Sequence, residues 1–149
     1  MDIIVQKYGG SSLIDIEKIK FVAERIVETK KNGYGVVVVV SAMGKTTDNL
    51  ISLAKQITTF PPARELDLLL STGEMVSVSL VCMAIENLGY EAEGFPGYFA
   101  GIKTDNVHTK ARIQKIDPKN IIRELNKNKI VVVAGFQGIS FENTITTLG

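Results

Sequence analysis

The sequence predicts an α/β fold in which helices cover a parallel or mostly parallel sheet. Three apolar runs rich in β-branched residues, Ile3–Val5, Val36–Val40 and Ile130–Ala134, indicate strands covered on both faces. Helical patterns lie between these runs, and strands that alternate with helices are typical of parallel sheets. A chain of 149 residues, 45% of them hydrophobic and 22% charged, can bury the core of one domain.

The first helix is predicted over residues 16–27, because apolar side chains recur there at helical spacing. Either Ser12 or Asp15 can cap its start, and Gly33 follows its basic end. A second helix is predicted over residues 50–57, before a Pro-Pro pair interrupts the pattern.

The next helical stretch is expected in two parts, 66–70 and 75–88, because Ser71–Gly73 interrupts the pattern. Its second part is apolar. Three sulfur-containing side chains of this stretch are interpreted as core residues: Met75, Cys82 and Met83.

A last helix is predicted to include Ile121–Leu125, with Asp117 as its cap and Pro118 in its first turn. Before it, residues 91–95 and 111–116 are predicted as short strands on either side of a glycine-containing loop. No internal repeat or linker divides the chain.

Composition narrows the classes of partner. The net charge of +1 favours neither nucleic acid nor an acidic membrane surface as a partner. Cys82 is the single cysteine, so no internal disulfide can form. The start of the chain lacks the pattern of a secretory signal, and fully apolar runs such as Val36–Val40 are too short to span a bilayer. We therefore expect a cytoplasmic protein.

Three polar or glycine-rich segments follow the three long apolar runs: Lys7–Ser12, Ser41–Thr47 and Gly135–Gly138. In parallel sheets, ligands bind beyond the carboxyl ends of the strands. Glycines that allow close backbone approach, with a lysine and a helix start beside them, suit a polyphosphate. An ordinary strand-to-helix turn uses the same residue types, so the first segment alone does not decide.

Two common nucleotide motifs are excluded. Gly44–Thr46 matches the end of a Walker P-loop, but Val39 stands where that motif needs its first glycine. Lys45 is therefore interpreted as a surface residue at a helix start, and Ser41, Thr46 and Thr47 as helix caps or ligand contacts. No dinucleotide-binding fingerprint is present either, because no third glycine follows Gly9–Gly10.

Two further ionisable residues, Glu74 and His108, are considered as functional residues. Glu74 either stabilises a helix start or holds a substrate ammonium group, and the local sequence fits both. His108, the only histidine, is interpreted as a loop residue without a catalytic role. With one histidine and one cysteine, a transition-metal site is not expected.

Four collinear blocks resemble the aspartokinase family: Lys7–Ser12, Val38–Leu50, Leu70–Glu74 and Val132–Gly138. The resemblance covers the whole chain. It implies the amino-acid-kinase fold, a three-layer α/β/α sandwich around a mainly parallel sheet. It also implies transfer of the γ-phosphoryl group of ATP to the β-carboxylate of L-aspartate, which gives 4-phospho-L-aspartate for lysine, threonine and methionine synthesis. Mg²⁺ would be held mainly through ATP.

The resemblance also implies residue roles. Lys7 would be the catalytic residue that contacts the ATP phosphates, and Ser41 would lie at the nucleotide and substrate. Thr47 and Glu74 would hold aspartate, Glu74 through the ammonium group. The remaining phosphate-binding positions implied are Tyr8, Gly9 and Gly10, and further candidates are Ser11, Gly135, Phe136 and Gly149.

In the family, the motif at Gly149 continues with Arg-Gly-Gly-Ser-Asp, and regulatory ACT domains follow. We therefore expect residues 1–149 to be the N-terminal, aspartate-side portion of a catalytic domain, inactive alone and inclined to self-associate. Two alternatives stay open. One is another kinase of this superfamily, such as a glutamate kinase, and the other is a non-catalytic small-molecule-binding or assembly module.

Overall fold

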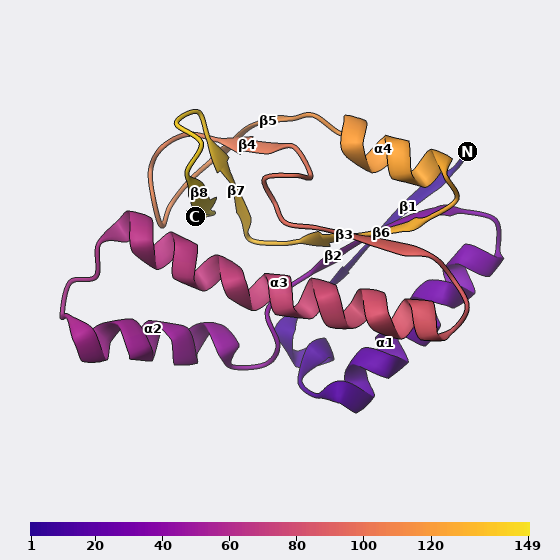
Figure 1. The fold of residues 1–149 in the computed structure, drawn as a ribbon, viewed down its shortest axis with the longest axis horizontal. Helices are drawn as coiled ribbons and strands as arrows, with labels where there is room; N and C mark the ends of the chain where they lie inside the picture. The colour runs from indigo at the N-terminus through magenta and orange to yellow at the C-terminus, as the bar shows by residue number, and fades with distance from the viewer.

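A computed structural model describes all residues, 1–149, and contains two four-stranded sheets and four α-helices (Figure 1). The first sheet has the strand order β1-β2-β6-β3 and is parallel throughout. Its strands are β1 (Ile3–Tyr8), β2 (Gly35–Val40), β6 (Ile130–Ala134) and β3 (Ala92–Phe95). The predicted α/β fold and its parallel sheet are confirmed.

Helices cover both faces of this sheet. On one face, α1 (Ile16–Lys31) and α3 (Ala63–Asn87) bury a cluster that includes Val36, Val38 and Val40 of β2. On the other face, α4 (Lys119–Asn126) packs over a smaller cluster that includes Val37 of β2. Alternate residues of one strand thus enter two cores, as the pleat requires. The layers are visible above and below the sheet in Figure 1.

The first strand departs from the prediction. It was expected to be covered on both faces, but β1 is an edge strand in which exposed and half-buried residues alternate. Its half-buried residues belong to the face that α1 and α3 cover, where Tyr8 packs on the larger cluster. Val5 is 65% exposed, because α4 covers β2 and β6 but does not extend over β1.

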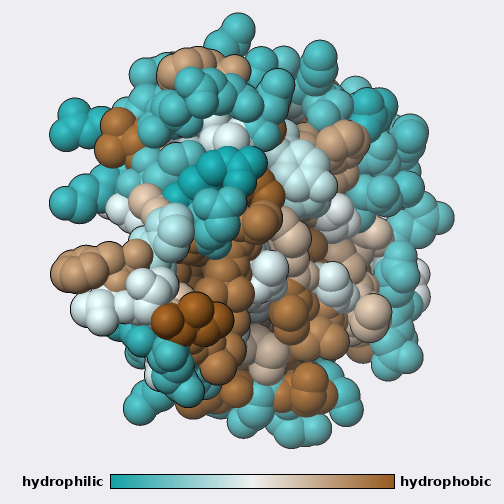
Figure 2. Space-filling view, turned by 60° about the vertical axis from the view of Figure 1, so that its left-hand side comes forward, coloured by the Kyte–Doolittle hydropathy of each residue, from teal (hydrophilic) through white to brown (hydrophobic).

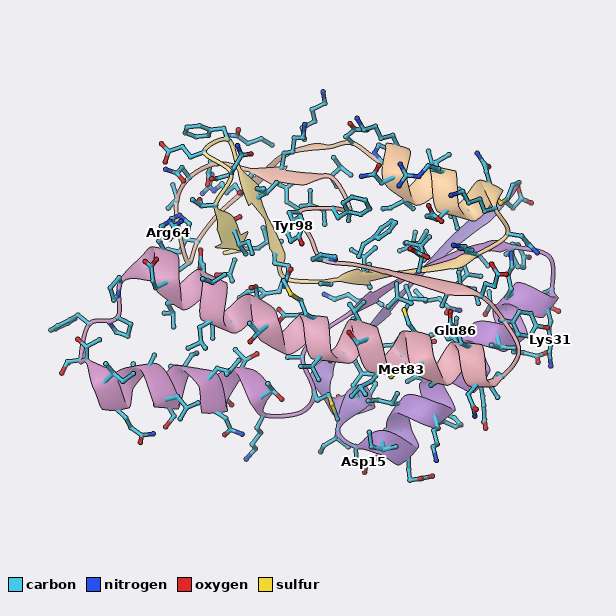
Figure 3. All side chains as sticks on the ribbon, viewed as in Figure 1. Asp15, Lys31, Arg64, Met83, Glu86 and Tyr98 are labelled. Carbon is cyan, nitrogen blue, oxygen red and sulfur yellow. The ribbon has the colours of Figure 1, made fainter.

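The starts of the first two helices follow their sequence signals. Asp15, labelled in Figure 3, caps α1 by accepting a hydrogen bond from the Lys18 backbone N–H at 2.8 Å. The alternative cap, Ser12, lies instead in the short 3₁₀ helix η1 (Gly10–Leu13). Helix α2 (Thr46–Ile57) begins four residues before the predicted segment and ends where predicted, before the Pro-Pro pair.

The predicted interruption of α3 is wrong. One continuous helix runs from Ala63 to Asn87 through Ser71–Gly73. The Ser71 and Thr72 hydroxyls donate to backbone carbonyls three residues earlier, at 2.7 Å each, so both are satisfied inside the helix. A Cβ at Gly73 would lie 3.0 Å from the Ala42 Cβ, so this glycine lets α3 pack closely against the loop after β2. Tertiary packing outweighs the weak helix propensity here.

By length and composition, α3 is also the one helix apolar enough to cross a membrane. Its buried stripe, however, packs on the sheet: Val78, Val81 and Ile85 belong to the larger core cluster. Met83 lies outside that stripe and is 63% exposed, so its predicted core position is wrong (Figure 3). Cys82 is half-buried against the core, as expected.

A second, mixed sheet was not predicted. Its order is β5-β4-β7-β8, with β5 (Ile113–Ile116), β4 (Ile102–Thr104), β7 (Gln137–Ser140) and β8 (Ile145–Thr147). These strands have only three or four residues and carry polar side chains, so they lack the apolar runs that mark the first sheet. The strand predicted over 111–116 is shorter in the structure, because β5 begins only at Ile113. Ala111 forms only an isolated bridge with Leu148.

A tight contact ties β4 to the start of α4. The Asp117 carboxylate accepts from the Lys119 backbone N–H at 3.2 Å, and the Asp117 backbone N–H donates to the Gly101 carbonyl at 3.0 Å. Pro118 itself takes the N-cap position, so the predicted arrangement, with Asp117 as cap and Pro118 in the first turn, is wrong by one residue.

Gly101→Ala is expected to destabilise the fold by about 3 kcal/mol or more. Gly101 has φ +84°, and a Cβ there would overlap the Asp117 carbonyl oxygen. Gly33→Ala is the matched control, because Gly33 has φ +93° with open space around it, and should cost about 1 kcal/mol. Urea unfolding of both variants measures the difference. Equal losses would show that the contact with Asp117 contributes nothing.

Candidate functional site

Three loops meet at the carboxyl ends of β1, β2 and β6, as predicted. The Ser41 backbone N–H donates to the Tyr8 carbonyl at 3.0 Å, and the Gly135 N–H donates to the Val40 carbonyl at 2.9 Å. Neighbouring strands therefore stay paired up to the point where their loops begin. The site is built on the rigid edge of the sheet.

The first two loops pack closely against each other. The Gly44 N–H donates to the Gly10 carbonyl at 3.0 Å, and a Cβ at Gly10 would lie 3.0 Å from the Ala42 carbonyl oxygen. A larger residue at position 10 would push the loops apart. Glycine is needed here for backbone contact between the two loops.

A cavity of about 720 Å³ lies beside these loops. Seven of the predicted site residues line it: Lys7, Ser41, Thr47, Glu74, Gly135, Phe136 and Gly149. They come from separate parts of the sequence, and the fold brings them to one place. Apolar side chains of the second sheet, Ile102 and Ile113, also line it.

Four predicted residues do not line this cavity: Tyr8, Gly9, Gly10 and Ser11. The Tyr8 ring packs against the core, and its hydroxyl lies 3.4 Å from the Gln6 side-chain oxygen. Burial raises the pKa of the Tyr8 phenol. Any contact of Tyr8 with a ligand in the cavity would therefore have to use its backbone.

Phe136 forms the turn between β6 and β7 in a left-handed conformation, with φ +65°. A bulky residue in this region costs free energy that the surroundings must offset. Its carbonyl accepts from the Leu148 backbone N–H at 2.9 Å. The turn thereby brings the end of the chain to the cavity wall.

Lys7 and Glu74 give the cavity its charge. Lys7 is exposed at the end of β1 and forms no salt bridge, so its ammonium group is available to an anion. Glu74 on α3 is 2% exposed, and its Oε2 atom is buried without a hydrogen-bond partner. Burial raises the pKa of Glu74 to about 7. An unpartnered buried carboxylate is costly alone and favours a cationic ligand.

Glu74 should make stability depend on pH. Its folded-state pKa of about 7 lies above the ordinary value of 4.5, so the folded protein holds this proton more tightly. The stabilisation is complete below pH 4.5 and is lost as pH rises through 7, by about 2–3 kcal/mol. Glu74→Gln should remove this loss and unfold at higher urea than the wild type at pH 8.

Urea midpoints between pH 5 and pH 8 measure this effect. Glu28→Gln is the control, because Glu28 is exposed on α1 and should leave the wild-type pH dependence intact. If Glu74→Gln keeps the full wild-type loss of stability, the buried carboxylate is not its source.

Gln137 is a cavity residue within the predicted Gly135–Gly138 segment that the sequence analysis did not name as a site residue. Its side chain is buried at the start of β7. The side-chain oxygen accepts from the Gly97 N–H at 3.1 Å, and the side-chain nitrogen donates to the Ser71 carbonyl at 3.0 Å. The carboxamide thus joins α3 to the loop after β3, one turn before Glu74.

Asp67 is a second residue that the sequence did not single out. It is fully buried on α3, and its carboxylate contacts His108 and Thr147. His108 lies in a turn between β4 and β5, so its predicted place in a loop is confirmed. No group of three or more His, Cys, Asp or Glu side chains is arranged to hold a metal ion.

Comparison with known proteins gives one consistent result. The model of the amino acid kinase family matches residues 2–149. The chain is 57% identical to an aspartokinase of Bacillus sp. (strain MGA3) and 52% identical to aspartokinase 2 of Bacillus subtilis (strain 168), each over 149 residues. Both matches cover all of this chain, which spans 36% of the length of either relative.

Solved structures agree. A crystal structure of aspartate kinase from Synechocystis matches with a TM-score of 0.81 and 41% identity. The match covers 99% of this chain and 24% of the Synechocystis chain. The structure of aspartokinase III of E. coli, in complex with aspartate and ADP, matches with a TM-score of 0.85 and 19% identity. The match covers all of this chain and 44% of the E. coli chain. The second match reports on the fold alone.

Proposed function

The chain belongs to the amino acid kinase family, and we propose that it provides the aspartate-binding and phosphate-binding side of an aspartokinase catalytic domain. One observation carries this proposal: a free ammonium group, Lys7, and a buried unpartnered carboxylate, Glu74, line a single cavity at the sheet edge. Identities of 52–57% to aspartokinases support the choice of reaction. Because the chain spans 36% of their length, the activity is proposed for a protein of that length.

The phosphate side is assigned to Lys7, Ser41 and the glycine loops. Lys7 supplies a full positive charge to the transferring phosphoryl group, and such charge stabilisation provides much of the catalysis in phosphoryl transfer. Ser41 and Gly44 line the cavity next to it. Gly10 lets the first loop pack closely on the second, so the two loops together form a rigid support.

The amino-acid side is assigned to Glu74 and Thr47. Glu74 accepts the substrate ammonium group, which gives its unpartnered oxygen a partner. The β-carboxylate of L-aspartate then attacks the γ-phosphorus of ATP through one oxygen, and the bond from that phosphorus to the β,γ-bridging oxygen breaks. The products are 4-phospho-L-aspartate and ADP. A carboxylate is already ionised at neutral pH, so the reaction needs no general base.

Mg²⁺ is proposed to be held mainly through the ATP phosphates. Mg²⁺ usually keeps several waters and is bound through substrate phosphates together with one or two carboxylates. When bound, Mg²⁺ would offset negative charge on the phosphates.

Self-association also remains a proposal, as does a cytoplasmic location. Large apolar side chains are exposed at Val5, Ile57 and Phe60. Figure 2 shows apolar side chains gathered over the lower part of one face, with hydrophilic ones around them. The expectation that the 149 residues alone do not turn over ATP likewise stays a prediction.

A substrate comparison tests the proposed function. In a protein of the relatives' length that carries these 149 residues, ADP formation should depend on L-aspartate, and L-glutamate should support at most about a hundredth of that rate. The difference is one methylene between ammonium and acceptor carboxylate, which moves the acceptor away from the phosphorus. A preference for glutamate would identify another kinase of the family, and no amino-acid-dependent turnover would favour a non-catalytic module.

A further inference from the structure

A buried carboxylate gathers four hydrogen-bond donors beside the cavity. Asp67 is fully buried in the second turn of α3. Its oxygens accept from the Thr109 backbone N–H at 3.0 Å, the Thr147 backbone N–H at 3.0 Å, the Thr147 hydroxyl at 2.6 Å and His108 Nδ1 at 2.7 Å. A carboxylate with so many donors holds its partners in fixed positions.

His108 extends this network. Its side chain is 13% exposed, and its Nε2 atom lies 3.2 Å from the Thr144 hydroxyl. A neutral ring protonated on Nδ1 satisfies both contacts, because Nδ1 donates to Asp67 while Nε2 accepts from Thr144. The Thr144 hydroxyl is also 2.7 Å from the Ser140 hydroxyl, so it belongs to the turn between β7 and β8.

The segment that Asp67 holds forms a wall of the cavity. Directly after Thr147, the Leu148 N–H donates to the Phe136 carbonyl at 2.9 Å, and the Gly149 N–H donates to the Ala111 carbonyl at 3.1 Å. Leu148 and Gly149 both line the cavity. The wall is therefore anchored to α3 at the residue that immediately precedes it.

The same helix carries Glu74, which also lines the cavity. Asp67 and Glu74 are seven residues apart, about two turns, so they lie on one buried face of α3. One rigid element thus positions both the carboxylate that lines the cavity and, through Asp67, the Leu148–Gly149 wall.

We propose that Asp67 and His108 are positioning residues that set the place of the Leu148–Gly149 wall relative to Glu74. They do not touch the ligand. The proposal rests on the proposed function for the identity of that ligand, an amino acid held by Glu74. Loss of the network should weaken amino-acid binding, because the wall then moves independently of α3, while the phosphate side at Lys7 stays in place.

Three variants separate positioning from packing. Asp67→Asn keeps the size of the side chain but removes its charge and turns an NH₂ group toward other donors. His108→Leu removes the Nδ1 contact. His108→Asn is the conservative variant, because its amide can offer an N–H close to the place of Nδ1. Ile26→Ala on α1 is the matched control, because Ile26 is fully buried in the core away from the cavity.

Steady-state kinetics and hydrogen–deuterium exchange of the peptide containing Thr146–Gly149 are measured in a protein of the relatives' length. For Asp67→Asn and His108→Leu we expect about 10-fold faster exchange of this peptide and about a 10-fold higher KM for aspartate. The KM for ATP and kcat should stay within about 3-fold of the wild type, and His108→Asn should restore the KM for aspartate.

Ile26→Ala should lower the melting temperature without either effect. Unchanged exchange in Asp67→Asn, or an equal rise in both KM values, would overturn the proposal. So would Ile26→Ala giving the same changes. If the wild type shows no aspartate-dependent turnover, the proposed function fails separately, and the exchange measurement still decides whether Asp67 holds the wall.

Discussion

Lys7→Ala is expected to lower kcat by about 10²- to 10³-fold in a protein of the relatives' length that carries this chain. The variant removes the one full positive charge assigned to the transferring phosphoryl group. Lys7 is exposed and forms no salt bridge, so the fold should lose little stability. A coupled assay of ADP formation measures kcat, and circular dichroism checks the fold.

Lys45→Ala is the matched control for this prediction. Lys45 is also an exposed lysine near the carboxyl end of a strand of the parallel sheet, but it does not line the cavity. It should leave kcat within about 2-fold of the wild type, because the charge of an exposed lysine is largely screened there. Unchanged kcat in Lys7→Ala, or an equal loss in both variants, would reject the assignment of the phosphate site.

Glu74→Gln should raise the KM for aspartate by about 10- to 100-fold, with little change in the KM for ATP. The amide keeps the shape of the side chain but loses the negative charge that faces the ammonium group. It also places an NH₂ donor where an acceptor is needed. Initial rates at varied aspartate and saturating ATP measure this effect.

Glu86→Gln controls for the loss of a charge from α3, because Glu86 is exposed near the end of the same helix (Figure 3). It should behave as the wild type. If Glu74→Gln raised the KM for ATP instead, Glu74 would belong to the nucleotide side of the cavity.

Much of this site could be predicted from the sequence because it is built on long apolar strands. Apolar runs rich in β-branched residues, such as Val36–Val40, are typical of buried strands, and parallel strands bring their following loops to one edge. Because Val39 stands where a P-loop needs a glycine, the sequence also favoured Lys7 over Lys45 as the phosphate-binding lysine. The structure agrees in that Lys7 lines the cavity and Lys45 does not. The resemblance to aspartokinases supplied the role of each residue.

The second sheet and the contacts of Asp67 could not be predicted in the same way. Strands of three or four residues such as β8 carry no periodic signal, and their pairing depends on tertiary contacts. Asp67 and His108 are 41 residues apart, and nothing in either neighbourhood indicates a contact. The continuity of α3 through Gly73 was likewise not predicted, because the packing partner of Gly73, Ala42, comes from another loop.

The central claim is that one cavity holds an amino acid at Glu74 and polyphosphate at Lys7. Its most direct test is a crystal structure of a protein of the relatives' length with L-aspartate and a non-hydrolysable ATP analogue. The substrate ammonium nitrogen should lie about 3 Å from a Glu74 carboxylate oxygen, and a terminal phosphate oxygen at a similar distance from Lys7 Nζ. Aspartate bound elsewhere, or bound here with its ammonium group away from Glu74, would contradict the account.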